Sequence, residues 1–184
     1  MKALRLYATS VLLVGAVAAA EATTAITLSN LALTEGAEVI ATGRCTGLRT
    51  VWEGRTLITV ATVAVDDVLK GEPGATVTVA LPGGSDANRA VPVAMTFAGA
   101  PQMTIGENVF LFLNRDTAVQ SGLVVMGFSQ GKFSIVADPA GQPVVSRDLT
   151  RLTLQSPAGT ERGTASRMPL DAFKREIREY LSRR

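Results

Sequence analysis

Histidine is absent from this chain of 184 residues, and cysteine occurs once, at Cys45. A serine hydrolase that relies on histidine as its base is therefore excluded, and so is a zinc site of the usual nitrogen and sulfur ligands. We expect no metal, no cofactor and no catalytic residue. The chain is interpreted as non-enzymatic.

The single cysteine also excludes an intramolecular disulfide, even in a compartment that would permit one. Cys45 stands in a segment rich in β-branched residues, between Glu38 and Thr50. We expect it to be a small buried hydrophobe on a strand. A reactive or intermolecular thiol is the alternative.

The net charge of the chain is close to zero when the basic residues of the N-terminal segment are left out. Without Lys2 and Arg5, the chain carries 16 basic and 16 acidic residues. Aromatic residues make up only 5% of the sequence and form no stripe with basic ones. A nucleic acid partner is therefore not expected, since binding a polyanion needs a basic surface.

A long apolar run is present only at the start of the chain. Lys2 and Arg5 precede the apolar segment Leu6 to Val17, which is followed by small residues suited to signal peptidase cleavage after Ala20 or Ala22. The segment is shorter than the roughly 20 residues that span a bilayer. Residues 1–20 are thus predicted to be a signal peptide, and the protein to be secreted or periplasmic, with no integral membrane segment after cleavage.

The remainder reads as mainly β. A short helix is predicted from Ser29, and alternating or continuous apolar runs predict the strands. These strands are expected at 38–50, 57–65, 75–81, 91–97, 107–113, 122–128, 132–136 and 144–145. We predict a five- to seven-stranded OB-like β-barrel over residues 35–155, with a closed barrel and a two-sheet sandwich both compatible with the pattern.

Two details of the strands are predicted. Apolar residues at 58, 60, 63 and 65 change phase near Ala61-Thr62, which is typical of a β-bulge. Residues 75–81 alternate cleanly and are expected to form a hairpin with this strand.

The C-terminus changes to helical spacing. Leu170, Phe173, Ile177 and Leu181 share one face of an amphipathic helix predicted at 168–184. Residues 156–167, rich in Gly, Ser and Thr, are expected to be a linker. The helix is expected to cover the barrel, and docking on an anionic membrane surface or a partner is the alternative.

Three motifs resemble chemical sites. Ser129 stands in a G-x-S-x-G pattern and, with Lys132, in an S-x-x-K pattern. Both are interpreted as coincidence, because the general base and the companion motifs are missing, so a serine hydrolase using Ser129 is the disfavoured alternative. The carboxylates of Asp66, Asp67, Glu72 and Asp86 match no calcium loop and are expected to be solvated.

One family resemblance covers residues 35–135. The chain has, in order, a helix, a bent strand, a turn at Trp52, a strand ending in Val63-Ala64-Val65-Asp66-Asp67-Val68-Leu69-Lys70-Gly71 and a strand ending in Pro82-Gly83-Gly84. This order and these motifs are similar to those of netrin-like and tissue-inhibitor-of-metalloproteinase modules. The resemblance implies an OB-type barrel. Those inhibitors chelate the protease zinc through an N-terminal cysteine, and Cys45 lies well inside the first strand, so no residue inherits that mechanism.

The expected function is therefore that of an exported, non-catalytic binding module for another protein or an envelope component. An inhibitor or accessory of an extracytoplasmic protease is the alternative. The expected binding residues are Trp52 and Arg55 on a turn and the Pro82, Gly83 and Gly84 break. For Trp52, local packing is the alternative.

Overall fold

The computed structural model describes residues 23–183. The signal peptide expected at residues 1–20 and the two cleavage positions lie outside this range. The described elements are β1 (Thr23–Ile26), α1 (Asn30–Gly36), β2 (Val39–Glu53), β3 (Thr56–Lys70), β4 (Thr76–Pro82), β5 (Gly84–Asp86), β6 (Val93–Met95), β7 (Asn108–Asn114), β8 (Leu123–Val125), β9 (Lys132–Ala137), β10 (Pro143–Asp148), β11 (Leu152–Ser156), β12 (Gly159–Arg162), β13 (Ala165–Pro169) and α2 (Leu170–Ser182).

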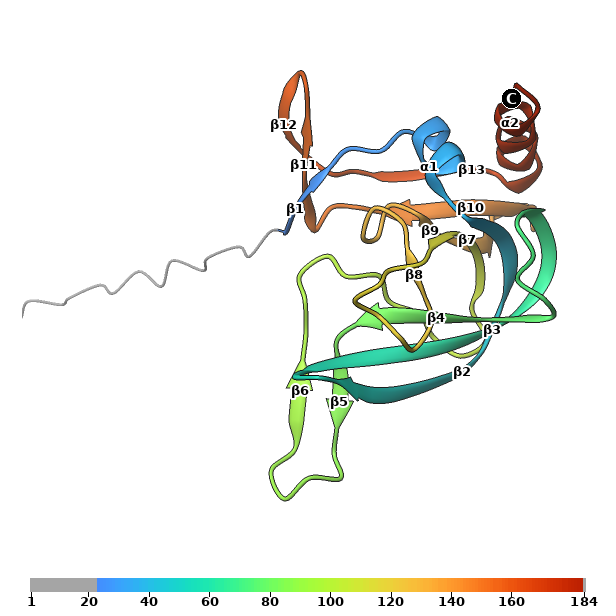
Figure 1. The fold of residues 1–184 in the computed structure, drawn as a ribbon. Helices are drawn as coiled ribbons and strands as arrows, with labels where there is room; N and C mark the ends of the chain where they lie inside the picture. The colour runs from blue at the N-terminus through green and yellow to red at the C-terminus, as the bar shows by residue number, and fades with distance from the viewer. Residues whose placement is uncertain (1–22, 184) are drawn as a thin grey trace, which may run out of the picture.

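Five strands of the largest sheet form a ring (Figure 1). The strands β7, β2, β3 and β4 are neighbours in that order and all pair antiparallel. The short strand β8 then pairs in parallel with β4 and antiparallel with β7, which joins the two ends of the row. The predicted mainly β fold is confirmed, and so is the predicted β3–β4 hairpin.

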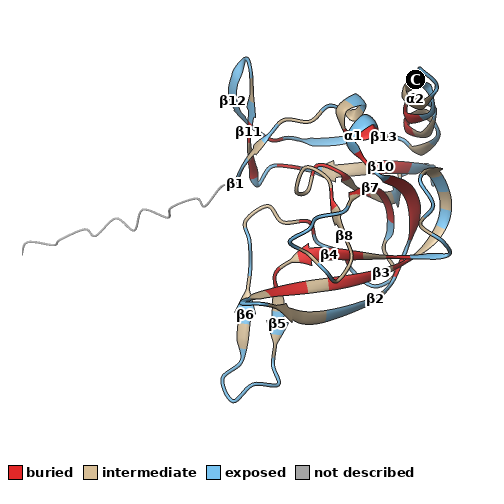
Figure 2. Cartoon of the chain, viewed as in Figure 1, coloured by how far each residue is buried: buried red, intermediate tan, exposed pale blue. Residues whose placement is uncertain are grey.

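The core lies inside this ring and on its outer faces. Alternate residues of the ring strands point inward, and Val63, Val79 and Leu111 are among those with 1% exposure or less. The strand β7 is buried on both faces, as its continuous apolar sequence predicts, because Phe110 and Phe112 point outward into a second cluster. Figure 2 shows the buried residues gathered in the ring strands, whereas β12 and the β5–β6 hairpin are mostly exposed.

The two helices cover the outer face of β7, β9 and β10. Ser29 caps α1 by accepting a hydrogen bond from the Ala32 amide at 3.1 Å. Phe173 and Ile177 of α2 are fully buried in the same cluster as Phe110 and Phe112. The amphipathic helix therefore docks on the protein's own sheet.

The bulge predicted at Ala61-Thr62 is wrong in its position. Both residues keep regular register with β2, and the change of apolar phase arises because β3 is covered on both faces there. The nearest irregularity lies on the partner strand, between Cys45 and Gly47. Two further register shifts lie nearer the end of β3, and there the extra residue is on β3 itself, at Asp66 and at Leu69.

Residues 156–167 are not a linker. They form β12, which pairs with β11, and most of β13, which pairs with β10 as an edge strand of the large sheet. Backbone hydrogen bonds order this segment even though it has few apolar side chains to bury. The sheet therefore extends past the expected domain end at residue 155.

Within residues 23–183, no helix has both the length and the apolar character needed to cross a bilayer.

Candidate functional site

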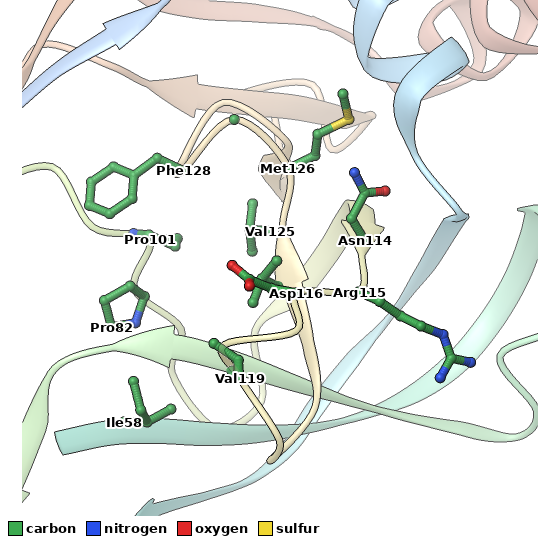
Figure 3. Close-up of a pocket in the computed structure, with 13 residues that line it drawn as sticks. Ile58, Pro82, Pro101, Asn114, Arg115, Asp116, Val119, Val125, Met126 and Phe128 are labelled. Atoms are coloured by element: carbon green, nitrogen blue, oxygen red, sulfur yellow. The ribbon is translucent and has the colours of Figure 1, made fainter. Parts of the chain in front are cut away.

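An apolar cavity of about 420 Å³ lies beside Pro82 (Figure 3). Its walls come from the ends of several strands and from the loops between them. Most of its lining residues are apolar, and we call it the Pro82 cavity; they include Ile58, Ala80, Pro82, Val119, Val124 and Val125. Concave apolar sites of this size are the usual place where proteins bind ligands or partner side chains.

The cavity exists because the loop between β7 and β8 is held over the outer face of β3 and β4. The Glu53 carboxylate, at the end of β2, accepts hydrogen bonds from the amides of Ser121 at 2.8 Å and Gln120 at 3.4 Å. Val119, on the same loop, packs against Ile58 and Val60. The loop is thus fixed in place by hydrogen bonds from its amides to the Glu53 side chain and by apolar contact.

The turn that follows β8 adds a conformationally unusual residue to the wall. Phe128 has a φ of 66°, and it is the only non-glycine residue in the left-handed region between residues 23 and 183. Such a backbone costs about 1–3 kcal/mol and clusters at functional sites. In Figure 3, Phe128, Pro101 and Pro82 lie along one side of the cavity, and Val125 lies on the other side.

Three polar residues line the mainly apolar cavity, Asn114, Arg115 and Asp116, and the last of them brings a carboxylate. Asp116 is exposed, and in Figure 3 its carboxylate points toward the side formed by Pro101 and Pro82. Its Oδ1 accepts a hydrogen bond from the Ala118 amide at 2.9 Å. The neighbouring Arg115 also lines the cavity, and its guanidinium pairs with Glu38 at 3.4 Å.

Three of the predicted binding residues lie together. Pro82, Gly83 and Gly84 line a second cavity of about 400 Å³. Glycine is required at position 83, where φ is 96° and an added Cβ would lie 2.7 Å from the Met95 carbonyl oxygen. Pro82 belongs to both cavities, so the predicted Pro82 break does adjoin concave surface.

The other two predicted binding residues do not join them. Trp52 lies in β2 and is half-buried, not on a turn, because the β2–β3 ladder continues to the Glu53–Thr56 pair. Its indole nitrogen donates to Asp86 Oδ2 at 2.8 Å, and the Arg89 guanidinium lies 4.4 Å from its ring centroid. Trp52 therefore ties β2 to the β5–β6 hairpin. Arg55 lies exposed on the turn itself and lines neither cavity.

Comparison with known proteins finds no matching family model, no matching curated protein and no matching solved structure. The resemblance to netrin-like modules stays a prediction from sequence motifs.

Cys45 is buried inside the ring with 1% exposure. Burial is the largest influence on the thiol and raises its pKa, and a backbone hydrogen bond at Gly47 only partly opposes this effect. Reactive thiols are partly exposed and have lowered pKa values. The expected buried position is confirmed, and this environment disfavours a reactive thiol.

Ser129 does not stand on a strand-to-helix elbow. It lies in the turn between β8 and β9, and the segment that follows is a strand. This turn interrupts two strands that run along the same edge of β7, because Phe112 exchanges backbone hydrogen bonds with Met126 and Gly131 on either side of it. The glycines of the motif serve this turn, as the sequence predicts.

A polar cluster lies close to Ser129 but involves other groups. Lys132 Nζ donates to Glu107 Oε1 and, at 3.0 Å, to Ser134 Oγ, which in turn donates to Glu107 at 2.7 Å. Lys132 and Ser134 line a third cavity of about 310 Å³. The Lys132 ammonium is thus engaged with Glu107 and Ser134, and no hydrogen bond joins it to the Ser129 side chain.

The charge state of Glu107 should appear in the pH dependence of stability. Burial alone would raise its pKa, but hydrogen bonds from Lys132 and Ser134 outweigh burial and lower it. Because the pKa of Glu107 is lower in the folded state, its ionised carboxylate stabilises the fold at a pH above the unfolded-state pKa of about 4.3. This stabilisation is lost as the pH falls through the folded-state pKa.

We expect Glu107→Gln to lower the free energy of unfolding at pH 7 by about 1.5–3 kcal/mol, because it removes charge-assisted hydrogen bonds. Urea unfolding between pH 7 and pH 3 checks this. Wild type should lose more stability than the variant on acidification, and Glu161→Gln on the exposed β12 should behave as wild type. Parallel pH profiles for wild type and Glu107→Gln would contradict the assignment.

Carboxylates are scattered through the described structure. Within residues 23–183, no group of three or more potential ligand residues comes close enough together to hold a metal ion. Of the four acidic residues considered in the sequence, Asp67 pairs with Lys174 at 2.8 Å, and Asp86 bonds to Trp52. Two of the four carboxylates expected to be solvated therefore have protein partners.

Proposed function

We propose that this chain is an exported, non-catalytic binding module that binds another protein through the Pro82 cavity and the adjoining hairpin. The observation that carries the proposal is the cavity itself, which is mainly apolar, lies at the surface and is lined by residues from β3, β4, β7, β8 and three loops. Apolar residues at a concave surface are typical anchors for partner side chains. Export rests on the N-terminal sequence of the chain.

The β5–β6 hairpin supports a protein partner. It extends away from the ring in Figure 1 and begins directly after Pro82. Val91, between its strands, is 74% exposed, and Phe97, just beyond it, is 44% exposed. The Trp52–Asp86 hydrogen bond holds the base of the hairpin. A projecting hairpin with exposed apolar residues offers a contact area larger than a small molecule needs.

We further propose that the ring is an OB-like barrel. The order β7, β2, β3, β4 places the fourth of these strands in the chain beside the first, which is the Greek-key arrangement. The short β8 completes the ring, giving five strands, the number found in OB folds. Folds of this type serve many functions, so the function is argued from the cavity.

Filling the cavity should abolish partner binding. Val119→Trp places an indole in the space beside Ile58 and Ala80, and a partner side chain can then no longer enter. The measurement is affinity capture from the extracytoplasmic fraction of the cells that make the protein, followed by mass spectrometry. A partner should be retained by wild type and lost by Val119→Trp.

The matched control is Val136→Trp, which makes the same change at a half-exposed position of β9 that lines none of the three cavities. It should retain the partner. If every captured protein binds Val119→Trp as well as wild type, the proposal fails. If the partner is a protease, its activity with and without the protein distinguishes an inhibitor from an accessory factor.

A further inference from the structure

We infer that the Pro82 cavity receives a basic side chain, lysine or arginine, of the partner protein. The aliphatic stem would lie against the apolar wall, and the cationic head would pair with the Asp116 carboxylate. This inference rests on the proposed function and specifies which chemical group the cavity recognises.

The first support is the state of the Asp116 carboxylate. Its Oδ1 accepts the Ala118 amide, which fixes the direction of the group. Between residues 23 and 183, no lysine or arginine forms an ion pair with it, although Arg115 is its neighbour in the chain and pairs with Glu38 instead. The loop thus presents a carboxylate that is oriented and lacks a cation.

The second support is the chemistry of the rest of the cavity. Ile58, Ala80 and Val124 offer only carbon atoms at its floor. A purely apolar ligand would fill this space but would remove water from Asp116 without replacing its hydrogen bonds, which is costly. A small polar ligand would satisfy Asp116 and leave the apolar floor without contacts.

A lysine or arginine side chain can contact the apolar wall and pair with the Asp116 carboxylate at the same time. Each carries a chain of methylene groups that packs on apolar surface and a cationic head that stays hydrated or paired. A pairing at the rim of the cavity keeps part of the solvation of both charges, which avoids the full desolvation cost of a buried ion pair. Neither acidic nor short polar side chains offer this combination.

The test compares two small probes on the ¹⁵N-labelled protein expressed from its full coding sequence. N-acetyl-lysine N-methylamide carries the stem and the charge, and N-acetyl-norleucine N-methylamide carries the stem alone. We expect both probes to shift the amide resonances of Val119 and of residues 124–128. The lysine probe should bind about 3- to 5-fold more tightly at low salt, and added salt should reduce this difference.

Asp116→Asn should remove the preference, so that the two probes bind equally. This variant keeps the Oδ1 acceptor for the Ala118 amide and therefore the loop. The matched control is Asp138→Asn, which removes a charge from another exposed turn where Oδ1 accepts the Ala140 and Gln142 amides. It should keep the preference for lysine.

Three outcomes would overturn the inference. Equal binding of the two probes to wild type would show that the cavity selects for apolar groups alone, and an unchanged preference in Asp116→Asn would place the charge recognition elsewhere. Tighter, Asp116-dependent binding of spermidine than of the lysine probe would indicate a free polyamine as the ligand. The wild-type comparison needs no variant to fold, and the Val119→Trp capture tests the proposed function separately.

Discussion

Replacing Phe173 with alanine is expected to lower the free energy of unfolding by about 3–5 kcal/mol, the usual cost of deleting a fully buried phenyl ring. Phe173 has 0% exposure. Its ring centroid lies 4.7 Å from that of Phe133, 4.9 Å from Phe110 and 6.2 Å from Phe112. The substitution removes aromatic contacts to three strand residues at once and opens a cavity between α2 and the sheet.

Urea unfolding at pH 7 measures this loss. Arg175→Ala is the matched control, because Arg175 is exposed on the same helix and alanine is a good helix former. It should change the stability by less than about 0.5 kcal/mol. If Phe173→Ala were as mild as the control, α2 would contribute little to the folded state and its docking on the sheet would be in doubt.

The second large effect is expected at Gln130, a buried polar residue with 1% exposure. Its side-chain oxygen accepts the Leu28 amide at 2.8 Å, and its side-chain nitrogen donates to the carbonyls of Ile26 at 2.8 Å and Gly127 at 3.2 Å. The Gln130 side-chain amide therefore makes the hydrogen bonds that a neighbouring backbone would make, and it joins the segment at the end of β1 to the turn before β9.

Gln130→Glu keeps the shape and the acceptor but turns the donor into a second acceptor facing two carbonyl oxygens. We expect a loss of about 3 kcal/mol or more at pH 7. Protonation restores one donor, so the folded-state pKa of this glutamate should lie above its unfolded value. The deficit should then be smaller at pH 4 and grow as pH rises.

Unfolding curves at the two pH values and hydrogen exchange of β1 test this expectation. Gln142→Glu is the control, since Gln142 is exposed in the turn before β10. It should match wild type at both pH values. A Gln130→Glu variant whose deficit did not change between pH 4 and pH 7 would show that the carboxylate escapes to solvent.

Much of the fold is predicted from the spacing of apolar residues, and the places where this prediction fails have physical causes. The apolar spacing of Phe173 and Ile177 identifies a docked helix, and the continuous run in β7 identifies a strand buried on both faces. The apolar spacing in β3 misplaces the bulge. Because part of β3 is covered on its second face as well, apolar residues occur there on both faces, and this pattern resembles the shift that a bulge produces. Residues 156–167 escape detection because edge strands such as β12 are held by backbone hydrogen bonds, which leave no apolar pattern.

The candidate site was only partly predictable. Pro82 and its glycines signal a break, and the structure places cavities on either side of it. The sequence gives no indication of Asp116, Val119 or Phe128, since the cavity forms only when Glu53 fastens a distant loop over β3. The sequence predicts Trp52 on a turn, as a binding residue or as a locally packed one, but its hydrogen bond to Asp86 depends on a hairpin that sequence alone does not position.

The pairing of β1 with β11 has a consequence for the order in which this protein assembles. Thr23 lies opposite Leu152 and Ile26 opposite Gln155, so the first strand of the described chain waits for partners near the other end. Contacts between residues so far apart in sequence form late, because a long loop must close first. A chain that emerges N-terminus first therefore holds β1 unpaired until nearly all of the described residues have been made.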